Sequence, residues 1–208
     1  MIHVGPDFKR VDPDLIAGYR KTNPATVGHV REDGFADTAI RPVYRKLKLV
    51  GSAFTVQIAG RDLAAISKAY ELAQPGDVLV VNGGDGPAYA CAGEISTFTS
   101  MRMGLAGLIV DGAVTDVIEM EAIGFPCFAR HISAKIGRKE GNSGAVRVPV
   151  EIGGVIVYPG DLVVADDNGI VFLNPEEAHE LLPTLLEKEA AEVILRSDYW
   201  NSAVQAGS

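Results

Sequence analysis

The chain has 208 residues, of which 47% are hydrophobic, so it can bury a sizeable core. Its formal net charge of −8 argues against a nucleic-acid partner, because phosphate backbones are bound by clustered lysine and arginine. The first residues lack the basic-then-apolar pattern of a secretory signal, and no apolar run approaches the roughly 20 residues that span a bilayer, so we expect a cytoplasmic protein without a membrane partner.

From residue 49 onward, strand and helix patterns alternate. In chain order they predict strand 49–58, helix 62–73, strand 78–81, helix 88–103, strand 108–110, helix 116–123 and strand 127–129. Consecutive strand–helix–strand units imply parallel strands with right-handed crossovers. Ligands of such sheets gather beyond the carboxyl ends of the strands. Two glycine-rich turns, 82–86 and 111–113, fall at those ends, so we expect the functional site there.

The last third of the chain changes character. Short β-branched runs predict strands at 146–150, 155–158, 162–165 and 170–173. Turn residues separate them, which favours an antiparallel meander packed on the parallel part. A helix over about 175–196 follows, with Asn174 as its cap and Pro175 at its first position. The expected fold is therefore layered α/β, a parallel βαβ core plus an antiparallel strand meander, in one domain over residues 1–208 with an N-terminal helical arm at about 1–47.

Several common catalytic motifs are absent from the sequence. It has no Gly-Lys-Ser/Thr phosphate loop, no Gly-x-Ser-x-Gly elbow, no His-Glu-x-x-His and no Cys/His set spaced for zinc. Cys91 and Cys127 have no Cys-x-x-Cys spacing, so we expect reduced, buried thiols. Nucleotide enzymes, serine hydrolases and zinc hydrolases are therefore disfavoured.

Acidic residues remain as candidates for chemistry. Asp111 and Asp116 flank the second glycine-rich turn, and Glu94 follows Gly93 in the preceding predicted helix. Carboxylates gathered at strand ends suit Mg²⁺ or Mn²⁺, which take oxygen ligands and keep several waters. The same positions also suit a structural interpretation, in which Asp111 caps a turn and Asp116 caps a helix.

A spaced set of motifs extends from about Thr26 to about Glu177. It comprises Gly76-Asp77-Val78-Leu79-Val80-Val81, Gly93-Glu94, Gly107-Leu108-Ile109-Val110-Asp111-Gly112-Ala113-Val114 with Asp116, Gly124-Phe125-Pro126, Val148-Pro149-Val150, Gly153-Gly154-Val155, Pro159-Gly160-Asp161 and Ala165-Asp166-Asp167-Asn168-Gly169. The set resembles the RraA-like family. That family includes class II 4-hydroxy-4-methyl-2-oxoglutarate and 4-carboxy-4-hydroxy-2-oxoadipate aldolases, and also regulators that inhibit ribonuclease E.

The resemblance implies a metal-dependent lyase that cleaves a small 2-oxo acid substrate to a pyruvate enolate by a retro-aldol reaction, with oxaloacetate decarboxylation as a side activity. It places Mg²⁺ or Mn²⁺ on Asp116, with Glu94 ordering metal-bound water. It places the substrate carboxylate at the backbone of Gly93, Ile95 and Ser96. It also implies a homotrimer or homohexamer whose active sites lie at subunit interfaces.

Two positions depart from the family pattern. The aldolases have arginine immediately before the metal aspartate, where this chain has Thr115, a catalytic and substrate-binding position. A threonine hydroxyl offers one neutral donor in place of a charged, bidentate guanidinium. Many relatives have a glutamate that reaches a neighbouring subunit's site where this chain has His29. We expect His29 or Arg31 to take a polar role there, and the alternative is that His29 is an ordinary surface residue.

Other polar residues and other functions stay open. His131, Arg138 and Lys139 are further candidates for the site's rim, although each also fits a solvated turn. The rival functions are a non-catalytic protein-binding regulator resembling the ribonuclease E inhibitors and a small-molecule binding domain that has lost activity. The regulators typically lack the metal aspartate, so the retention of Asp116 together with Asp111 and Glu94 favours chemistry.

Overall fold

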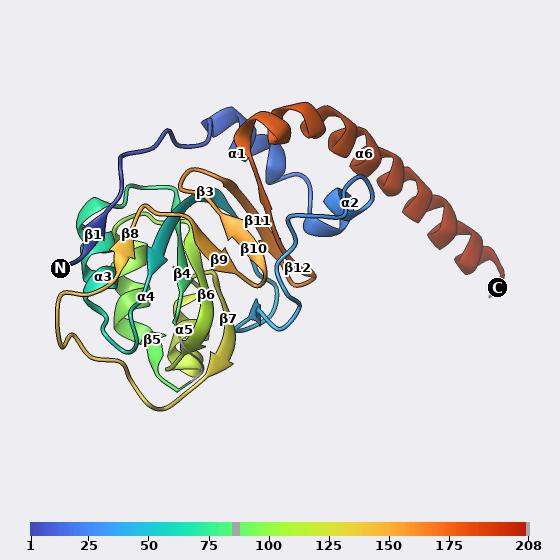
Figure 1. Cartoon of the computed structure of the whole chain (residues 1–208). Coiled ribbons are helices and arrows are strands. Elements are labelled where there is room, and N and C mark those ends of the chain that lie inside the picture. The colour runs from blue at the N-terminus through green and yellow to red at the C-terminus, as the bar shows by residue number, and fades with distance from the viewer. Residues whose placement is uncertain (85–87, 207–208) are drawn as a thin grey trace.

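A parallel sheet forms the centre of the molecule (Figure 1). The computed structural model describes residues 1–84 and 88–206, with side chains through residue 200. The core strands are β3 (Lys48–Gln57), β4 (Asp77–Asn82), β6 (Gly107–Val114) and β7 (Cys127–Ile132). Each pairs with the next in parallel, which confirms the predicted βαβ core.

Both faces of these strands are covered. Helices α3 (Ala64–Leu72), α4 (Glu94–Arg102) and α5 (Val117–Ile123) connect the core strands. Along β4 the side chains alternate between two apolar clusters: Leu79 and Val81 pack with α3 residues, whereas Val78 and Val80 pack against the opposite layer. Coverage of both faces explains why β4 has a continuous apolar sequence.

The C-terminal strands do not form a single antiparallel meander. Only β9 (Val150–Ile152) and β10 (Val155–Val157) form a separate antiparallel pair. The hairpin of β11 (Leu162–Asp166) and β12 (Gly169–Leu173) joins the main sheet by pairing antiparallel with the first half of β3. The short β8 (Ala145–Val146) pairs antiparallel with the end of β3 and parallel with β1 (His3–Val4). The antiparallel character is confirmed, but most of these strands extend the central sheet.

Two predicted boundaries near the expected site are wrong. The predicted helix 88–103 begins with a strand, β5 (Ala90–Ala92), which pairs with the end of β6, and α4 begins only after Gly93. The predicted turn 111–113 lies inside β6, where an irregular register allows pairing with both β5 and β7. The chain turns instead at residues 115–116. Part of the other predicted turn, 82–86, lies outside the described residues.

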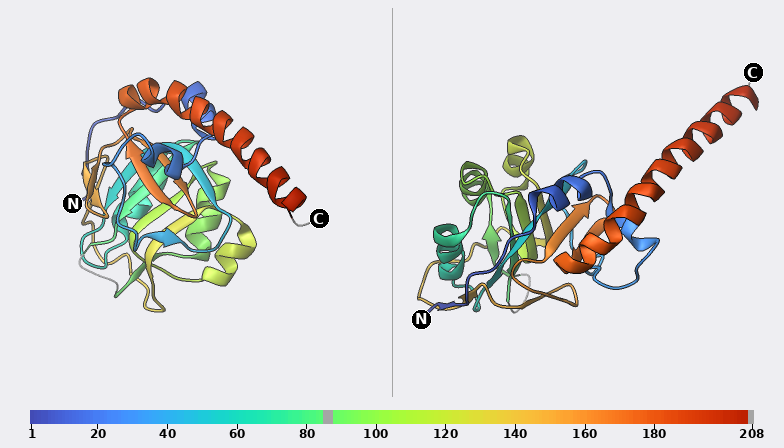
Figure 2. Two further views of the ribbon diagram at one scale, coloured as in Figure 1. Left: turned by 90° about the vertical axis from the view of Figure 1, so that its right-hand side faces the viewer. Right: turned by 90° about the horizontal axis from the view of Figure 1, so that it is seen from above.

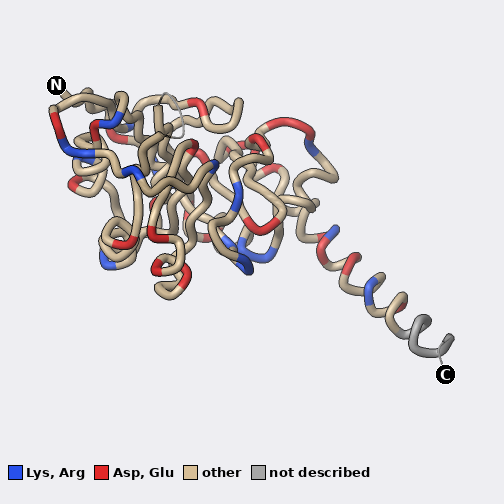
Figure 3. The backbone as a smooth tube through the Cα atoms, turned by 90° about the horizontal axis from the view of Figure 1, so that it is seen from below, with Lys and Arg blue, Asp and Glu red and all other residues tan. Residues whose placement is uncertain are grey.

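The N-terminal arm and the last helix pack on the β11–β12 hairpin. The arm contains two short helices, α1 (Pro13–Tyr19) and α2 (Pro24–Gly28), followed by β2 (Arg41–Pro42), which pairs with β7. Helix α6 (Pro175–Ala206) begins as predicted, with the Asn174 side chain accepting the Glu176 N–H at 2.9 Å, but continues beyond the expected end. It projects from the body (Figure 2), and acidic and basic residues follow one another along it (Figure 3). Among the described residues, no helix is both long and apolar enough to cross a membrane.

Candidate active site

Asp116 lies where β6 ends and α5 begins. Its backbone is left-handed, with φ 55° and ψ 42°, and its side chain makes no capping hydrogen bond to α5. The carboxylate reaches across to the neighbouring connection instead: Oδ2 accepts the Glu94 backbone N–H at 3.1 Å, and Oδ1 accepts the Thr115 hydroxyl at 3.2 Å. Asp116 therefore occupies a cap position without acting as a side-chain cap, and the structural interpretation of this residue does not account for its carboxylate.

The absence of a side chain at Gly93 leaves space for the Asp116 carboxylate. A Cβ on Gly93 would lie 2.4 Å from Asp116 Oδ2 and 2.8 Å from Thr115 Cγ2, both far inside ordinary contact distance. The neighbouring backbone is tied as well, because the Thr115 N–H donates to the Ala92 carbonyl at 2.9 Å. The β5–α4 and β6–α5 connections are thus held together, and glycine is the residue that permits this approach.

The first turn of α4 presents unpaired amides beside Asp116. The Ser96 hydroxyl accepts the Gly93 N–H at 2.7 Å and donates to the Gly93 carbonyl at 2.9 Å, which closes the start of the helix. Within the described part of the chain, the N–H groups of Ile95 and Ser96 have no acceptor. Free amides at a helix N-terminus, together with the helix dipole, suit a carboxylate or another anion.

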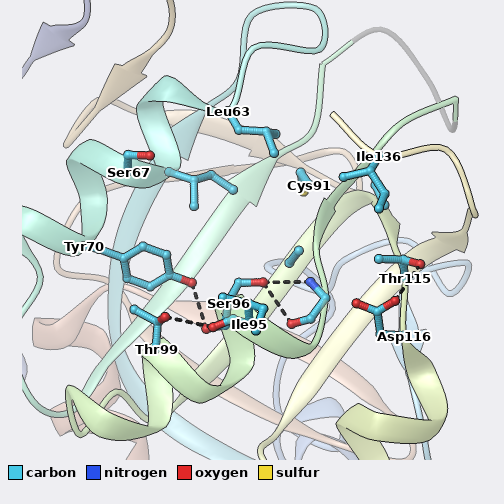
Figure 4. A pocket seen from close by; sticks show the side chains of 14 residues that line it. Leu63, Ser67, Tyr70, Cys91, Ile95, Ser96, Thr99, Thr115, Asp116 and Ile136 are labelled. Carbon is cyan, nitrogen blue, oxygen red and sulfur yellow. Dashed lines mark hydrogen bonds between the residues drawn. The ribbon is translucent and has the colours of Figure 1, made fainter. Parts of the chain in front are cut away.

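A pocket of about 330 Å³ adjoins these groups. Figure 4 shows Thr115 and Asp116 at one end, α4 residues along one side and α3 residues at the far side. Five of the site residues named from the sequence line this pocket, namely Thr115, Asp116, Gly93, Ile95 and Ser96. Glu94 is not among the lining residues, but its backbone N–H contacts Asp116.

Asp111 has a different partner and does not join Asp116. Its carboxylate pairs with Arg130 at 2.5 Å and accepts the Gly153 N–H at 2.6 Å. Arg130 also pairs with Asp37 at 2.8 Å. Asp111 therefore ties β6 and β7 to the β9–β10 turn and to the N-terminal arm. The expectation that Asp111 shares an acidic site with Asp116 is wrong, because Arg130 already neutralises it.

The histidine candidates lie away from the pocket. His29 follows α2, is mostly exposed, and its Nε2 is 3.8 Å from a Glu192 oxygen on α6. His131 lines a separate surface pocket together with Arg41 and Arg130. Within one copy of the chain, neither histidine belongs to the candidate site.

The loop that carries Arg138 and Lys139 is fixed near the pocket by its backbone rather than by those side chains. Arg138 exchanges backbone hydrogen bonds with Arg61 and Leu63 at 3.0 and 3.1 Å. Buried Asp62 accepts the N–H and the hydroxyl of Ser143, and these bonds hold the pKa of its carboxyl well below the usual range. Neither Arg138 nor Lys139 lines the pocket.

The donor groups at Asp116 fit a weakly held magnesium-type ion. Asp116 is exposed and offers hard carboxylate oxygens, the ligands that Mg²⁺ and Mn²⁺ prefer. Among the residues that the structure describes, no group of three or more potential metal-binding side chains gathers anywhere. Asp116, with Glu94 next to it, would therefore leave most coordination positions to water and substrate, as is usual for Mg²⁺.

Sequence reasoning missed the far wall of the pocket. Leu63 just before α3, Ile66 and Tyr70 on α3, and Ile136 in the loop after β7 line it. The helical spacing of the first three residues predicts a core-facing stripe and does not distinguish a packed core from a pocket wall. The position of Ile136 depends on long-range contacts: the Ala90 N–H donates to the Lys135 carbonyl, and the Gly137 N–H donates to the Ala90 carbonyl.

Known proteins resemble this chain in sequence and in structure. A family model described as RraA-like: Aldolase/RraA matches residues 26–172. A Halalkalibacterium halodurans protein, provisionally named 4-hydroxy-4-methyl-2-oxoglutarate aldolase, is 34% identical over 185 residues, which cover 88% of this chain and 87% of that protein. A Thermus thermophilus protein named 4-hydroxy-4-methyl-2-oxoglutarate aldolase is 35% identical over 112 residues, covering 54% of this chain and 68% of that protein.

Among solved structures, Streptomyces coelicolor RraAS2 is described as an unusual member of the RNase ES inhibitor RraA protein family. It matches with a TM-score of 0.79 and 28% identity, covering 91% of this chain and 100% of that one. The names of these relatives thus include both an aldolase and a member of an RNase inhibitor family. The family model, the fold and the relatives agree: this chain belongs to the RraA-like family.

Proposed function

We propose that this protein is a divalent-metal-dependent lyase that cleaves a small 4-hydroxy-2-oxo acid into pyruvate and a carbonyl compound. The observation that carries the proposal is the Asp116 carboxylate, which turns away from its own helix toward the free N-terminal amides of α4 at the edge of a pocket. The aldolase names among the relatives support the same class of reaction. Oxaloacetate decarboxylation, which passes through the same enolate, is an expected side activity.

Each residue of the site has a role in this proposal. Asp116, helped by Glu94 through a water molecule, holds Mg²⁺ or Mn²⁺, which would supply Lewis-acid stabilisation of the developing pyruvate enolate. The Ile95 and Ser96 amides bind the substrate carboxylate. Thr115 donates its hydroxyl where the family aldolases have arginine. Removal of one hydrogen-bond donor to a developing oxyanion costs about 3 kcal/mol of transition-state stabilisation, so we expect a slower reaction than in those aldolases.

We further propose a homotrimer or homohexamer in which His29 or Arg31 reaches the site of a neighbouring subunit. Arg31 pairs with Asp33 and Glu177 within its own chain, so His29, with its longer contact and greater exposure, is the better candidate. Measured turnover of His29→Ala and Arg31→Ala tests this role. A lower turnover for either variant is expected, and unchanged turnover for both would contradict it.

A substrate panel tests the proposed reaction. Pyruvate release from several 4-hydroxy-2-oxo acids and from oxaloacetate should depend on added Mg²⁺ or Mn²⁺ and should stop when the metal is chelated. Decarboxylation of oxaloacetate also occurs without enzyme, so a protein-free sample with the same metal concentration is the control. No metal-dependent product from any compound would reject the lyase.

The second candidate function is a protein-binding regulator resembling the RNase inhibitors of the family. One structural observation fits a partner protein as well as a second copy of the chain: among the described side chains of α6, five large apolar ones are more than half exposed, namely Val193, Ile194, Leu195, Tyr199 and Trp200. Failure of the substrate panel combined with specific inhibition of a ribonuclease by the purified protein would favour the regulator.

A further inference from the structure

The pocket beside Asp116 has an unusual chemical character for an enzyme of dicarboxylic acids. Its walls are mainly apolar, with contributions from Leu63, Ile66, Tyr70, Cys91, Ile95 and Ile136. Among the described residues that line it, Asp116 is the only one with a charged side chain.

The polar groups in the walls are neutral, and most are already engaged. The Tyr70 hydroxyl donates to the Ser96 carbonyl at 3.0 Å and lies 3.1 Å from the Ser100 hydroxyl; burial raises the pKa of Tyr70 to about 12. Burial also raises the pKa of the Cys91 thiol to about 12, so it stays protonated at neutral pH. The Thr99 hydroxyl donates to the Ile95 carbonyl at 2.8 Å. These groups offer no charge to a second carboxylate.

Two basic side chains near the pocket, Arg61 and Lys68, are paired with acids outside it, and Lys135, Arg138 and Lys139 in the neighbouring loop do not line it. Arg61 binds Glu140 at 2.8 Å and lies over the ring of Tyr89, and Lys68 pairs with Glu71. Neither Arg61 nor Lys68 lines the pocket. A carboxylate that entered this space would lose its hydration without gaining a cationic partner among the lining residues of its own chain, which is strongly unfavourable. An alkyl or aryl group would instead gain from leaving water.

We infer that the substrate of this site is a 4-hydroxy-2-oxo acid whose far end is apolar, because Leu63, apolar residues of α3 and Ile136 line the pocket beside Asp116 and no cation is among its described lining residues. This inference rests on the proposed lyase function. It assigns Leu63, Ile66 and Ile136 as specificity-determining residues. The pocket's volume of about 330 Å³ suits a short branched chain or a single ring.

The reaction balances without an added oxidant or reductant. The C3–C4 bond breaks and its electron pair passes to C3, forming the enolate of pyruvate. The C4 hydroxyl loses its proton to solvent and becomes the carbonyl of an apolar aldehyde. Solvent then returns one proton to C3, so the two products together have the atoms of the substrate.

Two substrates of nearly the same shape test the inference with the full chain and Mg²⁺. One is 4-hydroxy-2-oxoglutarate, whose far end is a carboxylate; the other is 4-hydroxy-5-methyl-2-oxohexanoate, whose far end is an isopropyl group. We expect kcat/KM for pyruvate release to favour the isopropyl compound by about 100-fold. Equal values, or a preference for the dicarboxylate, would overturn the inference.

A variant provides a second readout. Ser67 lies on α3 in the pocket wall, and Ser67→Arg adds a cation there without removing an apolar core residue. We expect it to shift the preference at least about tenfold toward the dicarboxylate. Gln74→Arg adds the same charge at an exposed position outside the pocket and should leave the preference unchanged. The same ratio in both variants and the wild type would contradict the assigned pocket.

Binding separates a failure of this inference from a failure of the proposed function. 5-Methyl-2-oxohexanoate and 2-oxoglutarate lack the C4 hydroxyl and cannot undergo the cleavage, so calorimetry with Mg²⁺ measures binding alone. If neither substrate releases pyruvate, the lyase proposal fails. Tighter binding of 5-methyl-2-oxohexanoate would then still support the apolar pocket, and equal or weaker binding would overturn it.

Discussion

Asp116 combines an uncommon backbone conformation with an exposed carboxylate. A positive φ such as the 55° of Asp116 is uncommon for residues other than glycine, although Asp and Asn tolerate it, and residues in this conformation concentrate at functional sites. The conformation turns the carboxylate toward Gly93 and α4 rather than toward the amides of α5. The backbone therefore fixes where the carboxylate lies, and an Asn at this position would keep that backbone while removing the charge.

Because a side chain at Gly93 would collide with the Asp116 carboxylate, we expect Gly93→Ala to lower activity. The added methyl group would lie 2.4 Å from Asp116 Oδ2, so the carboxylate must move away from the α4 amides. We expect pyruvate release to fall by about 100-fold or more, the usual size of an effect at a positioned charge-stabilising group. Gly28→Ala is the matched control, because its new Cβ meets only Phe35 at an ordinary 3.7 Å. Equal activity of the two variants would contradict the role given to Gly93.

Buried Asp161 lowers the free energy of unfolding when its carboxyl group is ionised, so its effect on stability depends on pH. Burial raises its pKa to about 6, partly opposed by the Tyr158 N–H that its carboxylate accepts at 2.8 Å. In an unfolded chain an aspartate titrates near pH 4, so between about 4 and 6 the folded protein binds more protons than the unfolded chain. The contribution of Asp161 to the free energy of unfolding is therefore full below pH 4 and falls as the pH rises toward 6.

Asp161→Asn should remove this loss. Urea unfolding should give the variant a free energy of unfolding about 1 kcal/mol higher than the wild type at pH 7.5, with the difference shrinking toward pH 4. A difference between variant and wild type that is constant with pH would show that the titration of Asp161 has no part in it.

The Arg130 cluster stabilises several elements together. Through Asp111, Asp37 and the Gly153 N–H it connects β6 and β7 with the N-terminal arm and the β9–β10 turn. Removing one partner of such a half-buried set leaves the other charges unpaired. We expect Arg130→Met to lower the free energy of unfolding by about 2 kcal/mol, as measured by urea unfolding, while the folded variant keeps metal-dependent pyruvate release. Loss of turnover in the folded variant would instead indicate that Asp111 belongs to the site.

Local sequence patterns predicted most helices and strands correctly, but they failed where pairing with a distant strand determines which element forms. The apolar runs at 78–81 and 108–110 become β4 and β6 because both of their faces are covered. The start of the predicted helix 88–103 becomes β5 because the last residues of β6 extend beyond its pairing with β4 and remain available for β5, which no local pattern encodes. The same limit applies to Asp111 and Asp116: their spacing placed both near strand ends, but only the fold shows that Arg130 lies beside one and Glu94 beside the other.

Among the described residues, the second part of α6 is not packed against any other helix or strand of its own chain. The first half of the helix packs against α1 and α2, where Glu189 accepts hydrogen bonds from Asn23 and Thr26, and the remainder projects from the body (Figure 2). Exposed apolar side chains such as Leu195 and Trp200 on that part suit burial against another copy. This surface is consistent with the proposed trimer or hexamer.

Light scattering tests the role of α6 in assembly. We expect the full chain to have the mass of a trimer or hexamer, and a chain ending at Ala191, which keeps Glu189 and its contacts, to have a smaller mass with unchanged folding by circular dichroism. A monomeric full chain would contradict the proposed assembly, and an unchanged mass after truncation would assign the interface to other elements.

If Asp116 makes this protein a metal-dependent lyase, a Mg²⁺ titration of pyruvate release depends on its carboxylate. Asp116→Asn keeps a residue that tolerates the left-handed backbone, and Glu119→Gln removes one carboxylate from an exposed position on the same helix, outside the pocket. We predict saturable activation by Mg²⁺ in the wild type and in Glu119→Gln, and at least about a 100-fold lower rate in Asp116→Asn. The same titration curve for all three proteins would contradict the account.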